Sequence, residues 1–188
     1  MISYHSLITV CWSILFLVWI ILAVNAKKSI HTIQTSKKAG IRFLLFVILA
    51  FLFNPTRLQK LLGTNLLSTN EFVLAFGVLT CASGVAFAIW ARIHLGNNWG
   101  MPMAQKESPE LVTSGPYRLV RHPIYTGIGL GMLGSAITVG IPWLIWFTYA
   151  SIAFYFSAIK EEKLMMEKFP ETYASYRAHT KMLIPFIY

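Results

Sequence analysis

The sequence predicts an all-α integral membrane protein with about five transmembrane helices, the last two paired as a hairpin and followed by amphipathic C-terminal helices. Hydrophobic residues make up 56% of the 188-residue chain and charged residues only 12%, a composition far too apolar for a soluble domain of this size. Several apolar runs are long enough to cross a hydrocarbon core of roughly 30 Å. The length leaves room for one domain, residues 1–188.

Each span follows from an apolar run and the residues that interrupt it. No Lys or Arg precedes the first run, which favours a retained span over a cleaved signal peptide. The second run is short and contains Arg42, so a buried or interfacial helix stays open there. The long run from Ile124 to Ile159 is interrupted by Gly140 and Pro142, which predicts a hairpin of two helices. We expect spans at about residues 7–24, 41–53, 71–91, 124–139 and 141–159.

The basic residues predict the orientation. With the N-terminus outside, 14 of the 16 Lys and Arg residues fall in cytoplasmic segments, and only Arg57 and Lys60 fall outside. The C-terminus is then cytoplasmic. The net charge of +9 is explained by this topology and by contact with anionic membrane lipids, and we expect no nucleic-acid partner.

Two patterns that resemble binding motifs are given structural interpretations. Cys11 and Cys81 lie inside apolar runs without a second ligand at metal spacing, so neither a disulfide nor a metal is implied. Gly129 to Gly134 match the dinucleotide pattern G-x-G-x-x-G but follow no strand. Small residues at Gly127, Gly131 and Ser135 instead predict the close approach of another helix.

The polar half of the chain breaks into loops and amphipathic helices. Gly and Pro residues punctuate the stretch from Arg92 to Arg121, where Trp99 is read as an interfacial anchor. After Ile159 an apolar stripe at helical spacing predicts an amphipathic helix, and Pro170 predicts that it splits at Phe169. Glu162 falls on this stripe.

Charged and aromatic residues that could bind a ligand concentrate in two segments. Gly115-Pro-Tyr-Arg-Leu-Val-Arg-His-Pro-Ile-Tyr-Thr-Gly127 sets cations and rings against an apolar run, with His122 at the entrance of the helix that Pro123 begins. Glu161 and Glu162 follow the hairpin. Taken singly, the aromatic residues can be interfacial anchors. The two carboxylates can likewise be solvent-exposed partners of Lys160 and Lys163. Together, acids and bases on two sides of a hairpin suit a small zwitterion.

These residues carry a resemblance to a known family. The string just given, then Glu161-Glu-x-Leu164, Phe169, Tyr173-x-x-Tyr-Arg177 and Ile184-Pro185, resembles the isoprenylcysteine carboxyl methyltransferase family and its phospholipid methyltransferase relatives. Ala91-Arg-x-x-Leu-Gly-x-x-Trp99 also looks like the segment before the cofactor loop in prokaryotic members. The match covers roughly the C-terminal 100 residues. It implies a membrane enzyme that uses S-adenosylmethionine, and it points to a prokaryotic plasma (inner) membrane.

The resemblance also implies a cofactor region over about residues 92–188. The periodicity predicts that Glu162 points into the protein, whereas the family pattern predicts that Glu161 contacts the cofactor. We choose Glu161 because we expect a helix to start near this point, where the apolar stripe defines the inward face imprecisely. The implied cofactor contacts are Leu111, Val112, Tyr117, His122, Pro123, Ile124, Tyr125 and Glu161.

The acceptor is the open part of the interpretation. A lipophilic substrate from the bilayer is expected, most simply a prenylcysteine-like carboxylate, with no obligate protein partner. Eukaryotic relatives hold that carboxylate with an Arg where this chain has Ser157. Arg92 is our candidate catalytic clamp, with a topological or lipid-binding role as the alternative, and Arg177 is a weaker candidate.

Three other functions remain as alternatives. One is N-methylation of a phospholipid or another amine, which needs a neutral acceptor and so favours a desolvated site or a nearby base. Another is a sterol-reductase-like enzyme that uses NADPH, whose phosphates should demand several cations beyond Arg118 and Arg121. The last is a membrane interaction protein without catalysis, in which the basic loop binds anionic lipid and Glu161 and Glu162 pair with lysines.

Overall fold

The computed structural model describes residues 3–23, 70–96, 111–185 and 187. The predicted second span, residues 41–53, and Trp99 lie outside the described residues. The described part of the chain is helical, with one isolated parallel bridge between Val120 and Lys181. The elements are α1 (Tyr4–Ala23), α4 (Glu71–Leu95), the 3-10 helix η2 (Gly115–Arg118), α5 (Pro123–Val139), α6 (Ile141–Lys168) and α7 (Pro170–His179).

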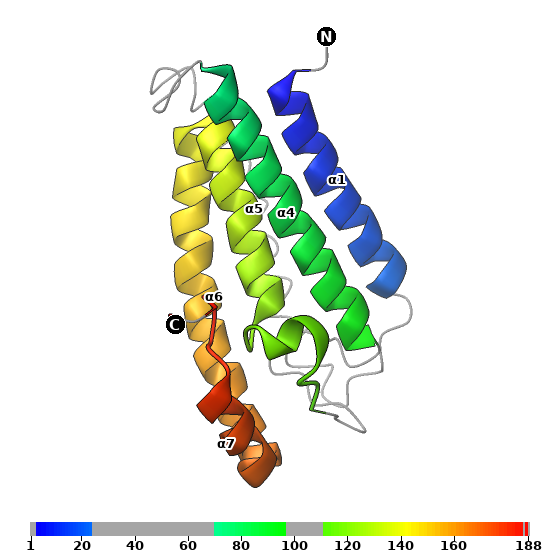
Figure 1. The fold of residues 1–188 in the computed structure, drawn as a ribbon, viewed down its shortest axis with the longest axis vertical. Helices are drawn as coiled ribbons and strands as arrows, with labels where there is room; N and C mark the ends of the chain where they lie inside the picture. Colours follow the sequence, from blue (N-terminus) through cyan, green and yellow to red (C-terminus); the bar gives the residue numbers. More distant parts are fainter. Residues whose placement is uncertain (1–2, 24–69, 97–110, 186, 188) are drawn as a thin grey trace, which may run out of the picture.

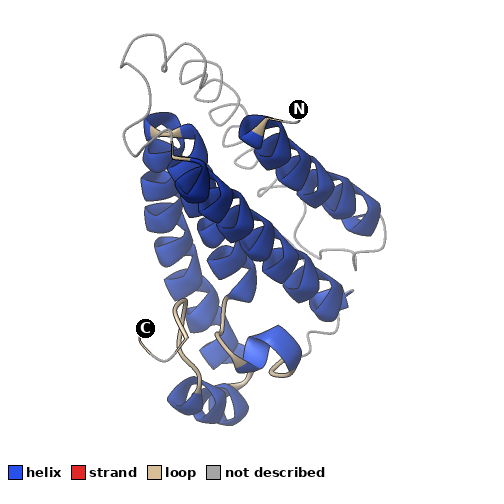
Figure 2. Cartoon of the chain, turned by 45° about the horizontal axis from the view of Figure 1, so that its top comes forward, coloured by secondary structure: helices blue, strands red, loops and turns tan. Residues whose placement is uncertain are grey.

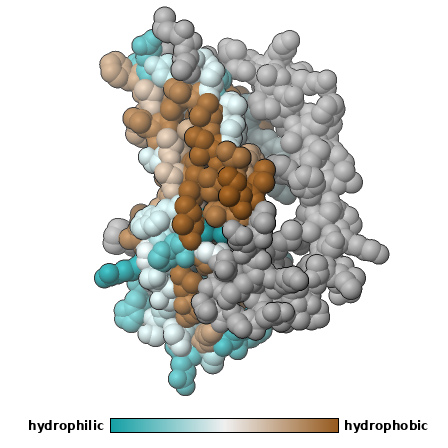
Figure 3. Space-filling model, turned by 90° about the vertical axis from the view of Figure 1, so that its right-hand side faces the viewer, coloured by the Kyte–Doolittle hydropathy of each residue, from teal (hydrophilic) through white to brown (hydrophobic). Residues whose placement is uncertain are grey.

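The long helices form an apolar bundle. In Figure 1, α1, α4, α5 and α6 run side by side, and α4 packs against both α1 and α5. By length and composition α1, α4 and α6 can each cross a membrane, and α5 is a shorter apolar helix. Figure 3 shows apolar residues gathered over the middle of the bundle and hydrophilic residues toward one end. The prediction of an all-α integral membrane protein is confirmed.

Gly140 makes the predicted hairpin between α5 and α6. Its φ of 107° lies in the region that only glycine adopts without strain, and Pro142 then stands in the first turn of α6. At the other end of α5, Pro123 occupies the first helical position after His122. The predicted start of α5 and the predicted break at Gly140 are therefore confirmed.

The continuation of α6 differs from the sequence expectation. The helix passes Ile159 without a break and ends at Lys168, because no Gly or Pro stands between Pro142 and Pro170. The expectation that a helix starts near Glu161 is wrong. The carboxylates instead lie well inside one helix, and the stripe that turned Glu162 inward was accurate. The predicted split at Phe169 is confirmed, since α7 begins at Pro170.

Glycines let α4 and α5 approach closely. A Cβ atom on Gly127 would lie 2.6 Å from the backbone nitrogen of Ala88 and 2.7 Å from the carbonyl oxygen of Gly84. Gly134 meets the backbone at Cys81 in the same way. The predicted small-residue contact is confirmed, and Gly129 and Gly134 lie in the interior of α5, where no dinucleotide loop can form.

Helix α1 is held to this pair by apolar and aromatic contacts. Ile8 and Leu15 are buried against Cys81 and Val85 of α4. Trp12 stacks on Trp143 with ring centroids 5.3 Å apart, and its Nε1 donates to Ser135 Oγ at 3.0 Å.

The polar elements collect at one end of the bundle. Figures 1 and 2 show η2, the start of α5, the C-terminal half of α6 and α7 at this end. The segment Thr180–Leu183, here called the C-terminal strap, returns from α7 along residues 120–122. Three segments that are distant in sequence therefore meet where α5 begins.

Candidate active site

His122 is placed by the start of α5 and by the C-terminal strap. It is the N-cap residue, with φ −123° and ψ 62°, a non-helical conformation of the kind that the following Pro123 imposes. Its backbone N–H donates to the carbonyl oxygen of Met182 at 3.1 Å. The imidazole side chain is only 9% exposed. Backbone and proline together therefore fix where the ring points.

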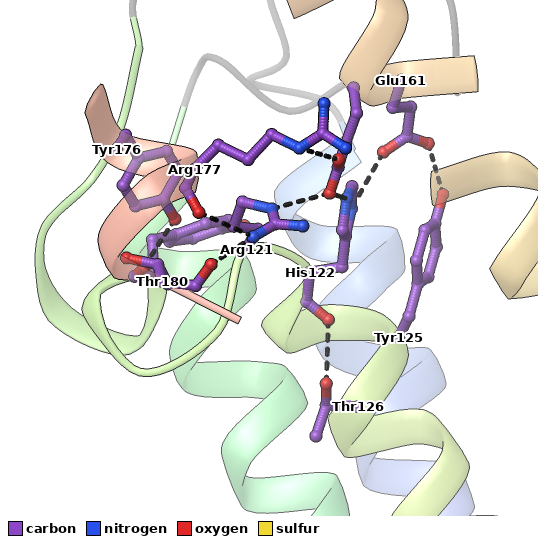
Figure 4. A network of polar contacts seen from close by, with 10 residues as sticks. Arg121, His122, Tyr125, Thr126, Glu161, Tyr176, Arg177 and Thr180 are labelled. Carbon is purple, nitrogen blue, oxygen red and sulfur yellow. Dashed lines mark hydrogen bonds and ion pairs between the residues drawn. The ribbon is translucent and has the colours of Figure 1, made fainter. Parts of the chain in front are cut away.

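Glu161 faces His122 and Tyr125 from α6. Its Oε2 lies 3.4 Å from His122 Nδ1, and its Oε1 accepts a hydrogen bond from the Tyr125 hydroxyl at 2.5 Å. The predicted convergence of His122, Tyr125 and Glu161 is present, as Figure 4 shows. The Glu161 side chain is 23% exposed, so part of this carboxylate remains open to a ligand.

Glu162, the next residue, points into the protein and is 5% exposed. Arg121 Nε donates to its Oε1 at 2.7 Å. His122 Nε2 lies 3.4 Å from the same oxygen, and Arg177 Nε lies 3.4 Å from Oε2. Because consecutive helical residues point about 100° apart, the two carboxylates serve different neighbours.

The site has a column of parallel rings. His122 stacks on Tyr125 with centroids 5.6 Å apart and planes at 9°, and Tyr125 stacks on Phe154 at 4.6 Å and 8°. The sequence prediction did not include Phe154. Helical spacing could have indicated Phe154, because it precedes Glu161 by two helical turns and so lies on the same face of α6.

Two carboxylates decide the charge of His122. Burial alone would lower the pKa of the imidazole, but Glu161 and Glu162 outweigh it and raise that pKa above its ordinary value of about 6.5. Beside them, burial raises the pKa of the Tyr117 hydroxyl, with further contributions from Tyr176 and Glu161. The two carboxylates therefore favour the protonated form of His122, and burial favours the neutral form of Tyr117.

Tyr117 lies in the adjoining turn. Gly115, with φ 60°, allows η2 to start there, and a Cβ on it would strike the His94 ring at 2.7 Å. The Tyr176 hydroxyl of α7 donates to the Tyr117 carbonyl oxygen at 2.5 Å, and His94 bonds Ser114 Oγ at 2.9 Å. These contacts tie η2 to both α4 and α7.

The remaining predicted cofactor residues surround this group. Pro123 is buried and Ile124 half-buried at the start of α5. Leu111 and Val112 are half-buried in the segment before η2. A role for these four side chains in holding a cofactor stays a prediction.

Arg92 lies at the same end of the bundle in a structural position. It is 1% exposed; Nη2 donates to the Leu22 carbonyl at the end of α1 at 2.7 Å, and Nη1 donates to the Gly96 carbonyl at 3.1 Å. These bonds satisfy carbonyls at the ends of two helices. The catalytic role predicted for Arg92 stays a prediction. The weaker candidate, Arg177, is half exposed and pairs with Glu162.

The arrangement suits a cationic ligand with an aromatic group. One carboxylate, Glu161, is partly open, while its neighbour is occupied by cations within the protein. Flat rings stand directly beside the open carboxylate, where they can stack on a planar group or a cation.

Comparison with known proteins places this site in a family. The family model described as phospholipid methyltransferase matches residues 72–172, which include α5 and all of α6. A protein-S-isoprenylcysteine O-methyltransferase of Xenopus laevis is 30% identical over 115 residues, covering 59% of this chain and 40% of that protein.

Two bacterial relatives carry names that refer to metal resistance. The cobalt-zinc-cadmium resistance protein CzcN of Cupriavidus metallidurans is 28% identical over 142 residues, 74% of this chain and 59% of its own length. The nickel-cobalt-cadmium resistance protein NccN of Alcaligenes xylosoxydans xylosoxydans is 28% identical over 115 residues, 60% of this chain and 50% of its own length. The chain thus spans between 40% and 59% of the curated relatives it matches. Within the described ranges, no three His, Cys, Asp or Glu side chains gather as metal ligands.

Proposed function

The chain belongs to the phospholipid methyltransferase family, and on this premise we propose that it transfers a methyl group from S-adenosylmethionine to a lipophilic acceptor that enters from the bilayer. The observation that carries the proposal is the Glu161 carboxylate, partly exposed and held by Tyr125 beside the His122 ring. S-adenosylmethionine supplies an electrophilic methyl group on a sulfonium centre, together with an ammonium, a carboxylate and an adenine ring.

Each of these groups has a counterpart in the chain. Glu161 is suited to the ammonium or the sulfonium, because an anion beside a cation in a partly buried site is stabilising. Tyr117 and the edge of the Tyr125 ring, whose faces lie between His122 and Phe154, would flank the adenine ring. Leu111, Val112 and Ile124 would then form apolar walls, as the family resemblance implies. The basic segment before α5, which includes Arg118, would meet the carboxylate, because both ring nitrogens of His122 already face Glu161 and Glu162.

We assign positioning as the main catalytic contribution of the protein. Methyl transfer is an in-line displacement, so the acceptor atom, the methyl carbon and the sulfur must be aligned, and alignment alone can supply a large share of the rate. A carboxylate acceptor is already a nucleophile and needs no base. A prenylcysteine-like carboxylate therefore fits a site in which the raised pKa of His122 makes the ring less available as a base at low and neutral pH.

The substrate carboxylate needs a cation that Ser157, half-buried on α6, does not supply. Arg92 is the proposed clamp, and its bonds to the carbonyls of Leu22 and Gly96 hold it near the Tyr117 side of the site. Such a role requires that substrate replaces at least one of these bonds. The second candidate acceptor is a phospholipid amine, favoured by the description of the matching family model. An amine must first lose its proton, which favours a desolvated site or a nearby base, and the structure shows no base assigned to that role among the described residues of the site.

The test is methyl transfer in reconstituted vesicles. Purified protein is incubated with S-adenosylmethionine carrying a deuterated methyl group and with either a farnesylated cysteine or phosphatidylethanolamine, and the lipids are read by mass spectrometry. We expect a deuteromethyl ester on the prenylcysteine, absent with Glu161→Gln. A labelled phosphatidylethanolamine would instead establish the second acceptor. No label on either lipid or on other membrane extracts, with folded protein, would contradict the proposal.

A further inference from the structure

The Arg121–Glu162 ion pair is tied to the C-terminal strap by several independent bonds. Arg121 Nη1 donates to the carbonyl oxygen of Thr180 and, at 3.3 Å, to that of Arg177. The Arg121 backbone N–H donates to the Lys181 carbonyl at 2.8 Å. One arginine thus holds the strap with its side chain and its backbone, as Figure 4 shows in part.

The strap fixes the next residues as well. The His122 N–H donates to the carbonyl of Met182, as noted above, and the Thr126 hydroxyl, in the first turn of α5, donates to the Leu183 carbonyl at 2.6 Å. The backbone at His122 therefore cannot shift without breaking bonds to a segment that comes about 60 residues later. A reaction that depends on alignment requires that the backbone carrying a site residue such as His122 be rigid.

Glu162 fixes the ring from the other side. Its side chain is 5% exposed, and the carboxylate meets two arginines and the His122 ring. With this many partners it has little capacity left for a ligand, and removing one partner would leave an uncompensated charge in the protein. Glu161 reaches the opposite nitrogen of the same imidazole. His122 is therefore held between two carboxylates of which only Glu161 is accessible.

We propose that Glu162 and Arg121 are positioning residues: their ion pair, locked to the C-terminal strap, orients His122 against Glu161 and leaves Glu161 as the carboxylate that meets a cationic ligand. Only the identity of the ligand rests on the proposed function. The orientation of His122 is a property of the free protein and can be tested without any cofactor.

The first measurement is an NMR titration of the histidine rings in detergent micelles, with the His122 signal assigned by its loss in His122→Asn. Glu162→Gln removes one of the two flanking charges, so we expect the His122 midpoint to fall by about one pH unit. Glu162→Asp keeps the charge at a greater distance and should give an intermediate midpoint. Glu167→Gln changes an exposed carboxylate five residues along the same helix and should leave the midpoint unchanged.

The second measurement is calorimetric binding of S-adenosylmethionine to the same proteins. Glu162→Gln should weaken binding by about tenfold, the effect typical of a residue that orients a ligand-binding group, with partial recovery in Glu162→Asp. Glu161→Gln should abolish it. Arg121→Lys keeps the charge but loses the several guanidinium contacts, so its affinity should resemble that of Glu162→Asp. If Glu162→Gln does not fold, Arg121→Lys serves as the test variant.

Two results would overturn the proposal. An unchanged His122 titration in Glu162→Gln and Arg121→Lys would show that the pair does not hold the ring. Loss of binding in Glu162→Gln as complete as in Glu161→Gln, with the titration unchanged, would make Glu162 a ligand contact. If the wild-type protein binds no S-adenosylmethionine, the proposed function fails, and the titration alone still decides the role of the pair.

Discussion

The hydroxyl group of Tyr125 donates to Glu161 Oε1 at 2.5 Å, joining the first turn of α5 to the C-terminal half of α6. The residues are 36 positions apart in sequence, and their contact closes the hairpin at its polar end. The same tyrosine ring lies between His122 and Phe154. Tyr125 therefore fixes both the carboxylate and the rings through which a ligand would be recognised.

Replacing Tyr125 by Phe should disturb Glu161 without emptying the ring column. A hydrogen bond to a charged group contributes roughly 1.5–3 kcal/mol, so we expect the affinity for S-adenosylmethionine to fall by about tenfold or more. Binding is measured by calorimetry in detergent. Tyr149→Phe, on the exposed surface of α6, is the control and should bind as the wild type does. Equal affinities for both variants would show that Tyr125 does not orient the carboxylate.

The pH dependence of stability should follow His122. Because its pKa is raised in the folded protein, the ion pairs with Glu161 and Glu162 are fully present below the ordinary histidine pKa of about 6.5 and are lost as pH rises through the folded value. Chemical unfolding in detergent should therefore show the free energy of unfolding of the wild type declining from about pH 6.5 upward. His122→Asn should flatten this decline, and a decline of unchanged steepness would refute the assignment.

A matched pair of glycines tests the packing of α5 on α4. A Cβ on Gly127 would lie 2.6 Å from the Ala88 nitrogen, whereas a Cβ on Gly129 meets nothing nearer than 4.0 Å. Gly127→Ala should lower the free energy of unfolding by about 1–3 kcal/mol through overpacking. Gly129→Ala should be neutral or stabilise the helix by up to about 1 kcal/mol. The reverse order of stabilities, measured by unfolding in detergent, would contradict the helix pairing.

Phe154 and Phe156 form a second matched pair on α6. Phe154 stacks on Tyr125, while Phe156 is 57% exposed on the outer surface of the bundle. A stacked aromatic pair contributes about 0.5–1.5 kcal/mol beyond its buried area. We expect Phe154→Ala to reduce kcat/KM for the lipid acceptor by roughly two- to tenfold and Phe156→Ala to leave it within error. Equal rates in a methyl-transfer assay would remove Phe154 from the site.

The sequence predicted those features that depend on local chemistry. Apolar runs and the Gly140 interruption predicted the hairpin, and Pro123 predicted that His122 stands at a helix entrance. The family resemblance predicted that Glu161 belongs to the same site as His122. These features follow from hydropathy, backbone restrictions and a dense motif, each of which is readable within a short window of residues.

Other long-range contacts were not predicted. The C-terminal strap bonds residues 121 and 122 to 181 and 182, and no periodicity in the chain signals that pairing. Glu162 was placed inward by its stripe, but its partners Arg121 and Arg177 come from two other segments. Arg92 illustrates the same limit: its position after a span allowed a topological or a catalytic reading, whereas its bonds to Leu22 and Gly96 emerge only in the fold.

The role of Glu161 in binding S-adenosylmethionine is decided by calorimetric titration of this cofactor into the purified wild-type protein and into Glu161→Gln, with Glu167→Gln as the charge-matched control. We expect binding by the wild type and by Glu167→Gln, and no measurable heat with folded Glu161→Gln. Equal affinity of all three proteins, or no binding by folded wild-type protein, would contradict this role.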